Sequence, residues 1–167
     1  MPKLPESGRG VVAVVAFTLS SIVTFGLYDS VGRARPSYVD CLRDPSFSAH
    51  CTDSPTASFP SGHTNEVFTA AGLSCVHHAH LPIYGSRLAD ALACARDVTL
   101  ATADGVLRIL GDRHYVTDVM AGAAIGFTFG YGMPLLLHYS VPRAPLAQLT
   151  LTPMSGSLVG ISAAGRF

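Results

Sequence analysis

The sequence predicts an all-α protein, a membrane helix bundle with about four spanning helices. Charged residues make up only 13% of the 167 residues and hydrophobic residues 49%, with a mean hydropathy of +0.37. Several apolar segments are long enough to cross a hydrocarbon core of about 30 Å as helices. The formal net charge is zero, which excludes the basic footprint of nucleic-acid-binding proteins, so we expect no nucleic-acid partner.

The first predicted span covers residues 10–28, nineteen residues without a charge. A signal peptide is the alternative, because basic residues precede the apolar run. We prefer a retained helix, because no small-residue cleavage site follows and the run leads directly into a polar segment. Further spans are predicted at 64–81, 88–107 and 118–138. Four spans place the loops 29–62 and 108–117 on the same side of the membrane.

The last two predicted spans carry features of helices packed inside a membrane. Three aspartates seven residues apart share one helix face, namely Asp90, Asp97 and Asp104. Charges at membrane depth face the bundle interior or water and pair, and Asp104 lies four residues before Arg108. Three glycines four residues apart favour close helix packing, namely Gly122, Gly126 and Gly130.

Residues 1–140 are expected to form a single helical domain. The segment 141–167 is rich in Pro, Ser and Gly, and part of it alternates weakly between apolar and polar residues. A short hairpin is the alternative there, but we expect a loose C-terminal tail.

The four cysteines divide into two pairs by context. Cys41 and Cys51 lie ten residues apart in a polar loop, which predicts a disulfide if that loop faces an oxidising compartment; two free thiols are the alternative. Cys75 and Cys94 lie in apolar segments and are expected to be small core residues. Three histidines lie close together in the sequence, namely His77, His78 and His80. No carboxylate or thiol near them in the sequence completes a ligand set, so we expect no metal site.

The stretch 108–118 combines Arg108, His114 and Asp118. If a helix begins near Tyr115, Asp118 lies one turn from His114 on the same face. A carboxylate there can accept a proton from one imidazole nitrogen and leave the other free to attack an electrophile. Arg108 offers a planar fork of donors for an anion. The alternative is that Asp118 only caps a helix.

A second chemical stretch is Pro60-Ser61-Gly62-His63. Pro60 and Ser61 indicate a helix start, and Gly62 lets the backbone approach a ligand closely. Backbone N–H groups at a helix N-terminus bind anions, and the Ser61 hydroxyl adds a donor. His63 in the same turn can protonate a leaving oxygen. The alternative is an ordinary turn carrying a surface histidine.

Together with Arg35-Pro36, these stretches resemble the three-part signature of the type-2 phosphatidic acid phosphatase superfamily, which includes bacterial class A acid phosphatases and vanadium haloperoxidases. The resemblance covers residues 25–138. It implies a phosphohistidine on His114, oriented by Asp118, with His63 as general acid. The implied phosphate-binding groups are Arg35, Ser61, the Gly62 backbone and Arg108. It implies no metal or other cofactor, because fixed guanidinium groups and N–H dipoles meet the transition-state charge.

The chain departs from the family pattern in three places. Tyr28 stands where the first motif has a Lys, and Leu107 stands where the third motif usually has a Ser. Membrane members usually have two spans before the first motif, and this chain has room for one, which fits a shortened homologue or a fragment. We expect the Tyr28 hydroxyl and Arg33, two residues before Arg35, to reach the phosphate and partly replace the missing cation.

The leading functional hypothesis is a membrane phosphatase acting on a lipid phosphate or diphosphate. The resemblance implies an integral membrane protein of a bacterial inner membrane, with the site facing the periplasm or exterior. One alternative is a soluble acid phosphatase or a vanadium haloperoxidase relative, against which the uncharged spans argue. The other is a truncated or degenerate member that binds without catalysis.

Overall fold

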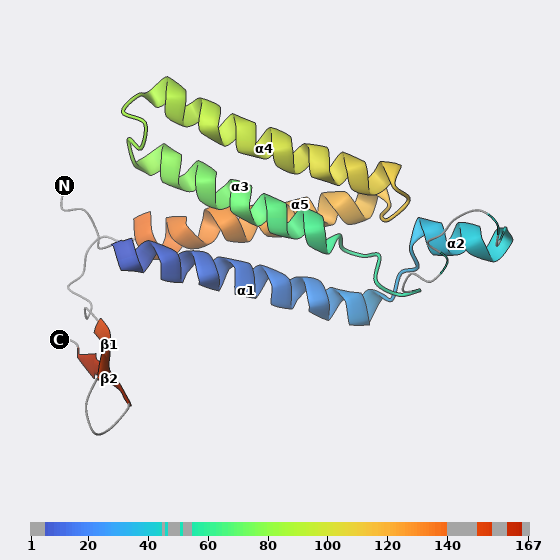
Figure 1. Cartoon of the computed structure of the whole chain (residues 1–167), viewed down its shortest axis with the longest axis horizontal. Helices are drawn as coiled ribbons and strands as arrows, with labels where there is room; N and C mark the ends of the chain where they lie inside the picture. The colour runs from blue at the N-terminus through green and yellow to red at the C-terminus, as the bar shows by residue number, and fades with distance from the viewer. Residues whose placement is uncertain are drawn as a thin grey trace.

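Four long helices lie side by side as an up-and-down bundle (Figure 1). The computed structural model describes residues 6–44, 46, 51, 55–139, 150–154 and 160–164. The helices are α1 (Glu6–Val31), α2 (Pro36–Arg43), α3 (Gly62–His80), α4 (Arg87–Leu110) and α5 (Val116–Pro134), and α5 continues into a short π-helix, η1 (Leu135–Tyr139). The short α2 extends beyond one end of the bundle. The predicted helical bundle is thus confirmed.

Two stretches are long and apolar enough to cross a membrane by length and composition. They are Arg9–Arg43, which runs through α1 and α2, and Val116–Tyr139, which is α5 with η1. Four spanning helices therefore stay a prediction, although four long helices are present.

The contact between α3 and α5 is a close approach of two backbones. A Cβ atom added at each of three glycines of α5 would collide with a main-chain carbonyl oxygen. The colliding pairs are Gly122 with Ser61, Gly126 with Asn65, and Gly130 with Thr69. Only glycine permits this separation, because the obstacles are main-chain atoms of α3. The glycine spacing therefore predicted the packing face of α5 correctly.

The three aspartates of α4 are all paired. The pairs are Asp90 with Nδ1 of His78 at 2.7 Å, Asp97 with the Ser74 hydroxyl at 2.5 Å, and Asp104 with Nη2 of Arg108 at 3.3 Å. The first two join α4 to α3, and the third lies along α4 beside the end of the helix. The expectation that these charges pair is confirmed.

Two disulfides are present. Cys41 is joined to Cys51 with a Cα–Cα distance of 5.4 Å, which ties α2 to the loop after it. Cys75 is joined to Cys94 with a Cα–Cα distance of 4.6 Å, which ties α3 to α4. The expectation of two unpaired core cysteines was therefore wrong. Cys75 lies six residues before the turn 81–86 and Cys94 eight residues after it, so the antiparallel packing of α3 and α4 brings them within bridging distance.

Two short strands follow the bundle in the chain. β1 (Thr150–Met154) pairs antiparallel with β2 (Gly160–Ala164), and Thr152 lies opposite Ser162. In these two stretches the hairpin that the weak alternation allowed is present, and not the loose tail that we preferred. The remainder of the segment 141–167 lies outside the described residues.

Candidate active site

The three motif stretches meet at the end of the bundle where α1 and α4 end and α3 and α5 begin (Figure 1). Main-chain hydrogen bonds connect the three stretches, although they are far apart in the sequence. These bonds run from Ser58 N to Arg33 O at 3.0 Å, from Ser61 N to Asp118 O at 2.9 Å, and from Ser37 N to Asp112 O at 2.9 Å. These hydrogen bonds bring the polar residues of the three motif stretches together at one end of the bundle.

His114 lies in the loop between α4 and α5, and only 3% of its surface is exposed. Its Nδ1 atom is 2.7 Å from the carbonyl oxygen of Ser58. A carbonyl oxygen can only accept, so Nδ1 carries the proton and donates it. This partner assigns the tautomer and leaves Nε2 with a free lone pair. An imidazole in this state is chemically able to attack an electrophile through Nε2.

Asp118 lies in the first turn of α5 and is fully buried. Its Oδ2 accepts hydrogen bonds from the Ser58 hydroxyl at 2.6 Å and from the Tyr115 N–H at 2.9 Å, and its Oδ1 accepts from Nη1 of Arg33 at 2.7 Å. Nδ1 of His114 is 3.9 Å from Oδ2, too far for a hydrogen bond. The expected direct bond from His114 to Asp118 was therefore wrong, because the Ser58 carbonyl takes the proton that the carboxylate was expected to accept.

Two arginines from different elements act electrostatically on His114. Arg35, directly before α2, donates from Nε to the carbonyl oxygen of Ala57 at 3.3 Å. Arg108, near the end of α4, is held by its ion pair with Asp104. Two guanidinium groups beside an imidazole nucleophile suit a dianionic phosphate.

The surroundings of His114 favour its neutral form. Burial lowers the pKa of His114 below its usual value, and the positive charges of Arg35 and Arg108 lower the pKa further. The hydrogen bond to the Ser58 carbonyl and the charge of Asp118 act in the opposite direction without overcoming burial. A neutral imidazole is the form that can attack phosphorus.

The start of α3 supplies the other predicted groups. Ser61 is buried, with its hydroxyl 2.9 Å from the Thr64 hydroxyl, and His63 is exposed in the first turn of the helix. The Tyr28 hydroxyl lies against Gly62 and accepts a hydrogen bond from its backbone N–H. The Tyr28 O–H proton is then available to donate to a neighbouring oxygen. Gly62 is required here, because a Cβ would collide with that hydroxyl.

Arg33 is placed differently from our expectation. Its Nη1 donates to Asp118 and, at 2.7 Å, to the hydroxyl of Thr117, and its guanidinium lies 4.0 Å above the ring of Tyr115. We predicted that Arg33 would contact phosphate, whereas in this structure its guanidinium is bound to Asp118 and Thr117. Sequence reasoning also missed Ser58, whose only signal is its position just before Phe59-Pro60.

The helical bundle, the buried imidazole and the two guanidinium groups near it form an arrangement that suits a phosphate. The family model of the PAP2 superfamily matches residues 9–142, and the chain belongs to this superfamily.

Among curated proteins, the chain is similar to the lipid A 1-phosphatase of Porphyromonas gingivalis, with 40% identity over 73 residues. That match includes 44% of this chain and 15% of the relative, so the chain spans a small part of the relative's length. No solved structure matches the chain significantly.

Proposed function

We propose that the protein is a phosphatase that hydrolyses a lipid phosphate or diphosphate monoester through a phosphohistidine at His114. The observation that carries the proposal is the state of His114. It is buried, its surroundings lower its pKa and so favour the neutral form, the Ser58 carbonyl fixes its tautomer, and the charges of Arg35 and Arg108 act on it. Family membership and the similarity to a lipid A 1-phosphatase support the same reaction class.

The reaction has two steps in this proposal. Nε2 of His114 attacks phosphorus, the bond from phosphorus to the lipid oxygen breaks, and His63 gives that oxygen a proton. Water then attacks phosphorus, the N–P bond breaks, and His63 takes the proton from the water. Arg35 and Arg108 offset the negative charge on the phosphoryl oxygens in both steps.

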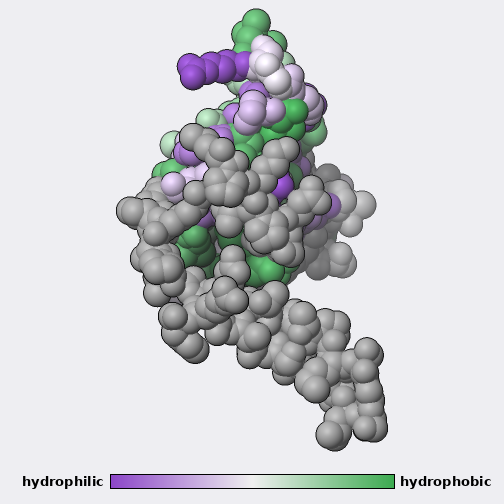
Figure 2. Space-filling view, turned by 90° about the vertical axis from the view of Figure 1, so that its left-hand side faces the viewer, coloured by the Kyte–Doolittle hydropathy of each residue, from purple (hydrophilic) through white to green (hydrophobic). Residues whose placement is uncertain are grey.

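The poor burial of the apolar helices supports a membrane location. Only 17% of the most apolar window of Arg9–Arg43 and 22% of that of Val116–Tyr139 is buried inside the molecule, whereas a core helix of a soluble protein is mostly buried. Large side chains of α1 are 60–66% exposed, namely Val11, Val14, Ile22 and Phe25. Hydrophobic side chains also reach the surface in Figure 2. We therefore propose four spanning helices around one site at a membrane surface.

The Cys41–Cys51 disulfide supports one orientation of the site across the membrane. The bridge lies in the polar loop on the same side of the bundle as His114. Disulfides persist in oxidising compartments such as the bacterial periplasm. We propose that the protein lies in a bacterial inner membrane with the site facing the periplasm or exterior.

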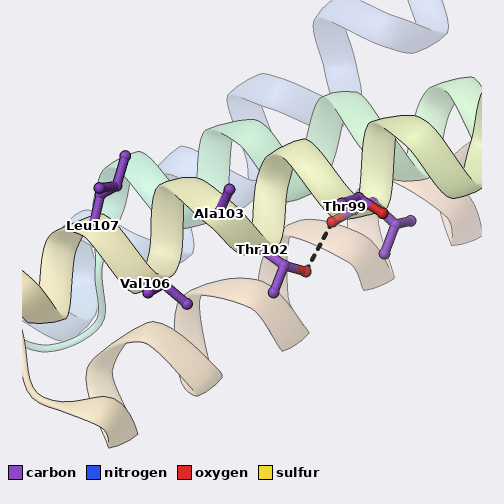
Figure 3. A pocket seen from close by; sticks show the side chains of 6 residues that line it. Thr99, Thr102, Ala103, Val106 and Leu107 are labelled. Carbon is purple, nitrogen blue, oxygen red and sulfur yellow. Dashed lines mark hydrogen bonds between the residues drawn. The ribbon is translucent and has the colours of Figure 1, made fainter.

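A shallow apolar groove on α4 supports a substrate with a hydrocarbon chain (Figure 3). Its volume is about 520 Å³, and its lining is Val98, Thr99, Thr102, Ala103, Val106 and Leu107. The Thr99 and Thr102 hydroxyls donate to carbonyl oxygens of α4 at 2.7 and 2.8 Å, so the wall of the groove is made of methyl groups. The lining ends at Leu107, the residue before Arg108, so a hydrocarbon chain in the groove would lie along the helix that carries Arg108.

A substrate panel tests the proposed function. The purified protein in detergent with a chelator is offered phosphatidate, phosphatidylglycerol phosphate, a polyprenyl diphosphate, lipid A 1-phosphate and water-soluble p-nitrophenyl phosphate. We expect release of phosphate from at least one lipid, at a higher kcat/KM than from the soluble ester, and loss of release in His114→Ala. Absence of turnover of every substrate by the folded protein, or full activity in His114→Ala, would contradict the proposal.

A further inference from the structure

Ser58 is the point where three functional stretches are joined. Its N–H donates to the Arg33 carbonyl at 3.0 Å, its carbonyl accepts from Nδ1 of His114 at 2.7 Å, and its hydroxyl donates to Oδ2 of Asp118 at 2.6 Å. Its side chain is fully buried. Every polar group of this residue is used, and each is directed at a residue of the site.

We propose that Ser58 is a positioning residue for the nucleophile: its carbonyl holds Nδ1 of His114, while its hydroxyl and the Arg33 guanidinium hold Asp118. This inference rests on the proposed function of His114. It assigns Arg33 as the counter-charge of Asp118 and not as a phosphate ligand.

The arrangement separates two tasks that one carboxylate would otherwise perform. The Ser58 carbonyl fixes the tautomer of His114 as a neutral acceptor, so no charged carboxylate has to lie directly against Nδ1. Asp118, at 3.9 Å from Nδ1, is still near enough to favour the positively charged phosphoimidazole that forms after attack. The free imidazole is thus kept neutral, and the intermediate is stabilised when it appears.

Arg33 completes this arrangement from the other side of the carboxylate. Asp118 is fully buried, and a buried carboxylate requires a partner. Arg33 binds Oδ1, which leaves Oδ2 directed at the Ser58 hydroxyl and the Tyr115 N–H. The Tyr115 ring below the guanidinium holds Arg33 in this position. The charged groups facing His114 itself are Arg35, Arg108 and Asp118.

Substitutions at Ser58 test the positioning role. Ser58→Ala removes the hydroxyl and keeps the carbonyl, so we expect kcat to fall about ten- to a hundredfold with KM within about twofold. Without the hydroxyl, the charge of Asp118 is less offset and favours imidazolium at His114 more strongly. The acid limb of kcat/KM therefore moves to higher pH. Ser58→Thr restores a hydroxyl and should recover part of kcat and the original limb.

Ser20→Ala is the matched control. Ser20 is also a fully buried serine, and its hydroxyl lies 3.2 Å from that of Thr69 on α3, two turns before Tyr28 along α1. This variant should lower the unfolding temperature while leaving kcat and the pH profile within about twofold of wild type. An equal fall of kcat in Ser20→Ala and Ser58→Ala would show a general packing defect and overturn the assignment.

Arg33 distinguishes the two roles through kinetics. Arg33→Gln should lower kcat about tenfold at nearly constant KM and move the acid limb upward, as Ser58→Ala does. In an Asp118→Asn background, the same change should have little further effect, because the charge that Arg33 offsets is gone. A several-fold rise in KM at constant kcat, persisting in Asp118→Asn, would make Arg33 a phosphate ligand and overturn this part of the assignment.

Histidine ¹⁵N NMR tests the inference independently of turnover, with His114 assigned by His114→Ala. We expect the Nδ1–H tautomer in wild type and a higher titration midpoint in Ser58→Ala. An Nε2–H tautomer, or an unchanged midpoint, would overturn the inference even in a protein without phosphatase activity. A failed substrate panel with the expected NMR result would instead contradict the proposed function alone.

Discussion

Gly126→Ala should destabilise the protein through the contact between α5 and α3. A Cβ at this position would collide with the carbonyl oxygen of Asn65 and lie 3.0 Å from both the Asn65 carbonyl carbon and the Thr69 nitrogen. All three are main-chain atoms, so no side-chain rotation relieves the collision. The two helices have to separate.

The magnitude follows from two opposing effects. Overpacking a well-packed interface costs about 1–3 kcal/mol, and the rigid backbone here favours the upper half of that range. Replacing a helical glycine by alanine stabilises a helix by about 0.5–1 kcal/mol. We therefore expect a net loss of roughly 1–2.5 kcal/mol. Activity should fall as well, because separation of α3 from α5 weakens the bond from Ser61 N to Asp118 O that joins the motif stretches.

Gly26→Ala is the control, since Gly26 lies within α1 and has nothing within 4 Å of an added Cβ. The free energy of unfolding of both variants is measured in the same detergent. We expect Gly26→Ala to equal or exceed wild type while Gly126→Ala falls below it. If Gly126→Ala were as stable as Gly26→Ala, the close approach of α3 and α5 would be refuted.

Three further predictions concern the site and its support. Tyr28→Lys should lower KM several-fold, by about 1 kcal/mol of binding, because a charged donor replaces a neutral one; an unchanged KM would show that the missing cation is not needed. The acid limb of kcat/KM should lie below pH 6.5, because burial lowers the pKa of His114 and activity is lost when falling pH protonates it; a His114 titration midpoint above pH 6.5 by ¹⁵N NMR would contradict this. Reducing the Cys41–Cys51 bridge should lower the free energy of unfolding by about 2.7 kcal/mol and reducing Cys75–Cys94 by about 3.2 kcal/mol on the chain-entropy model. Mass analysis that finds four free thiols in protein purified from membranes without a reductant would contradict both bridges.

The features predictable from sequence are those that depend on local spacing. The glycines four residues apart predicted the packing face of α5, and the offset between Asp104 and Arg108 predicted their ion pair. The Cys75–Cys94 bridge was also predictable, because Cys75 lies six residues before the turn between α3 and α4 and Cys94 eight residues after it. We considered each cysteine only within its own apolar segment and therefore missed the pairing across the turn.

The details of the site depend on partners distant in the sequence. His114 and Asp118 lie one turn apart, as their spacing predicts, yet Nδ1 finds the carbonyl of a residue 56 positions earlier. Arg33 was expected at the phosphate because Arg35 is two residues away. A buried carboxylate needs a positive partner, however, and Asp118 lies within reach of Arg33. No local pattern reveals where the loop carrying Ser58 will lie.

The identity of the nucleophile is tested most directly by trapping the intermediate. The protein is mixed with a ³²P-labelled lipid phosphate that it hydrolyses, quenched within one turnover, and the protein-bound label is tested for stability in acid and alkali. We expect label on wild-type protein that is labile in acid and stable in alkali, located at His114 by peptide mapping and absent from His114→Ala. Label that persists in His114→Ala, or hydrolysis by that variant at the wild-type rate, would contradict the assignment of His114.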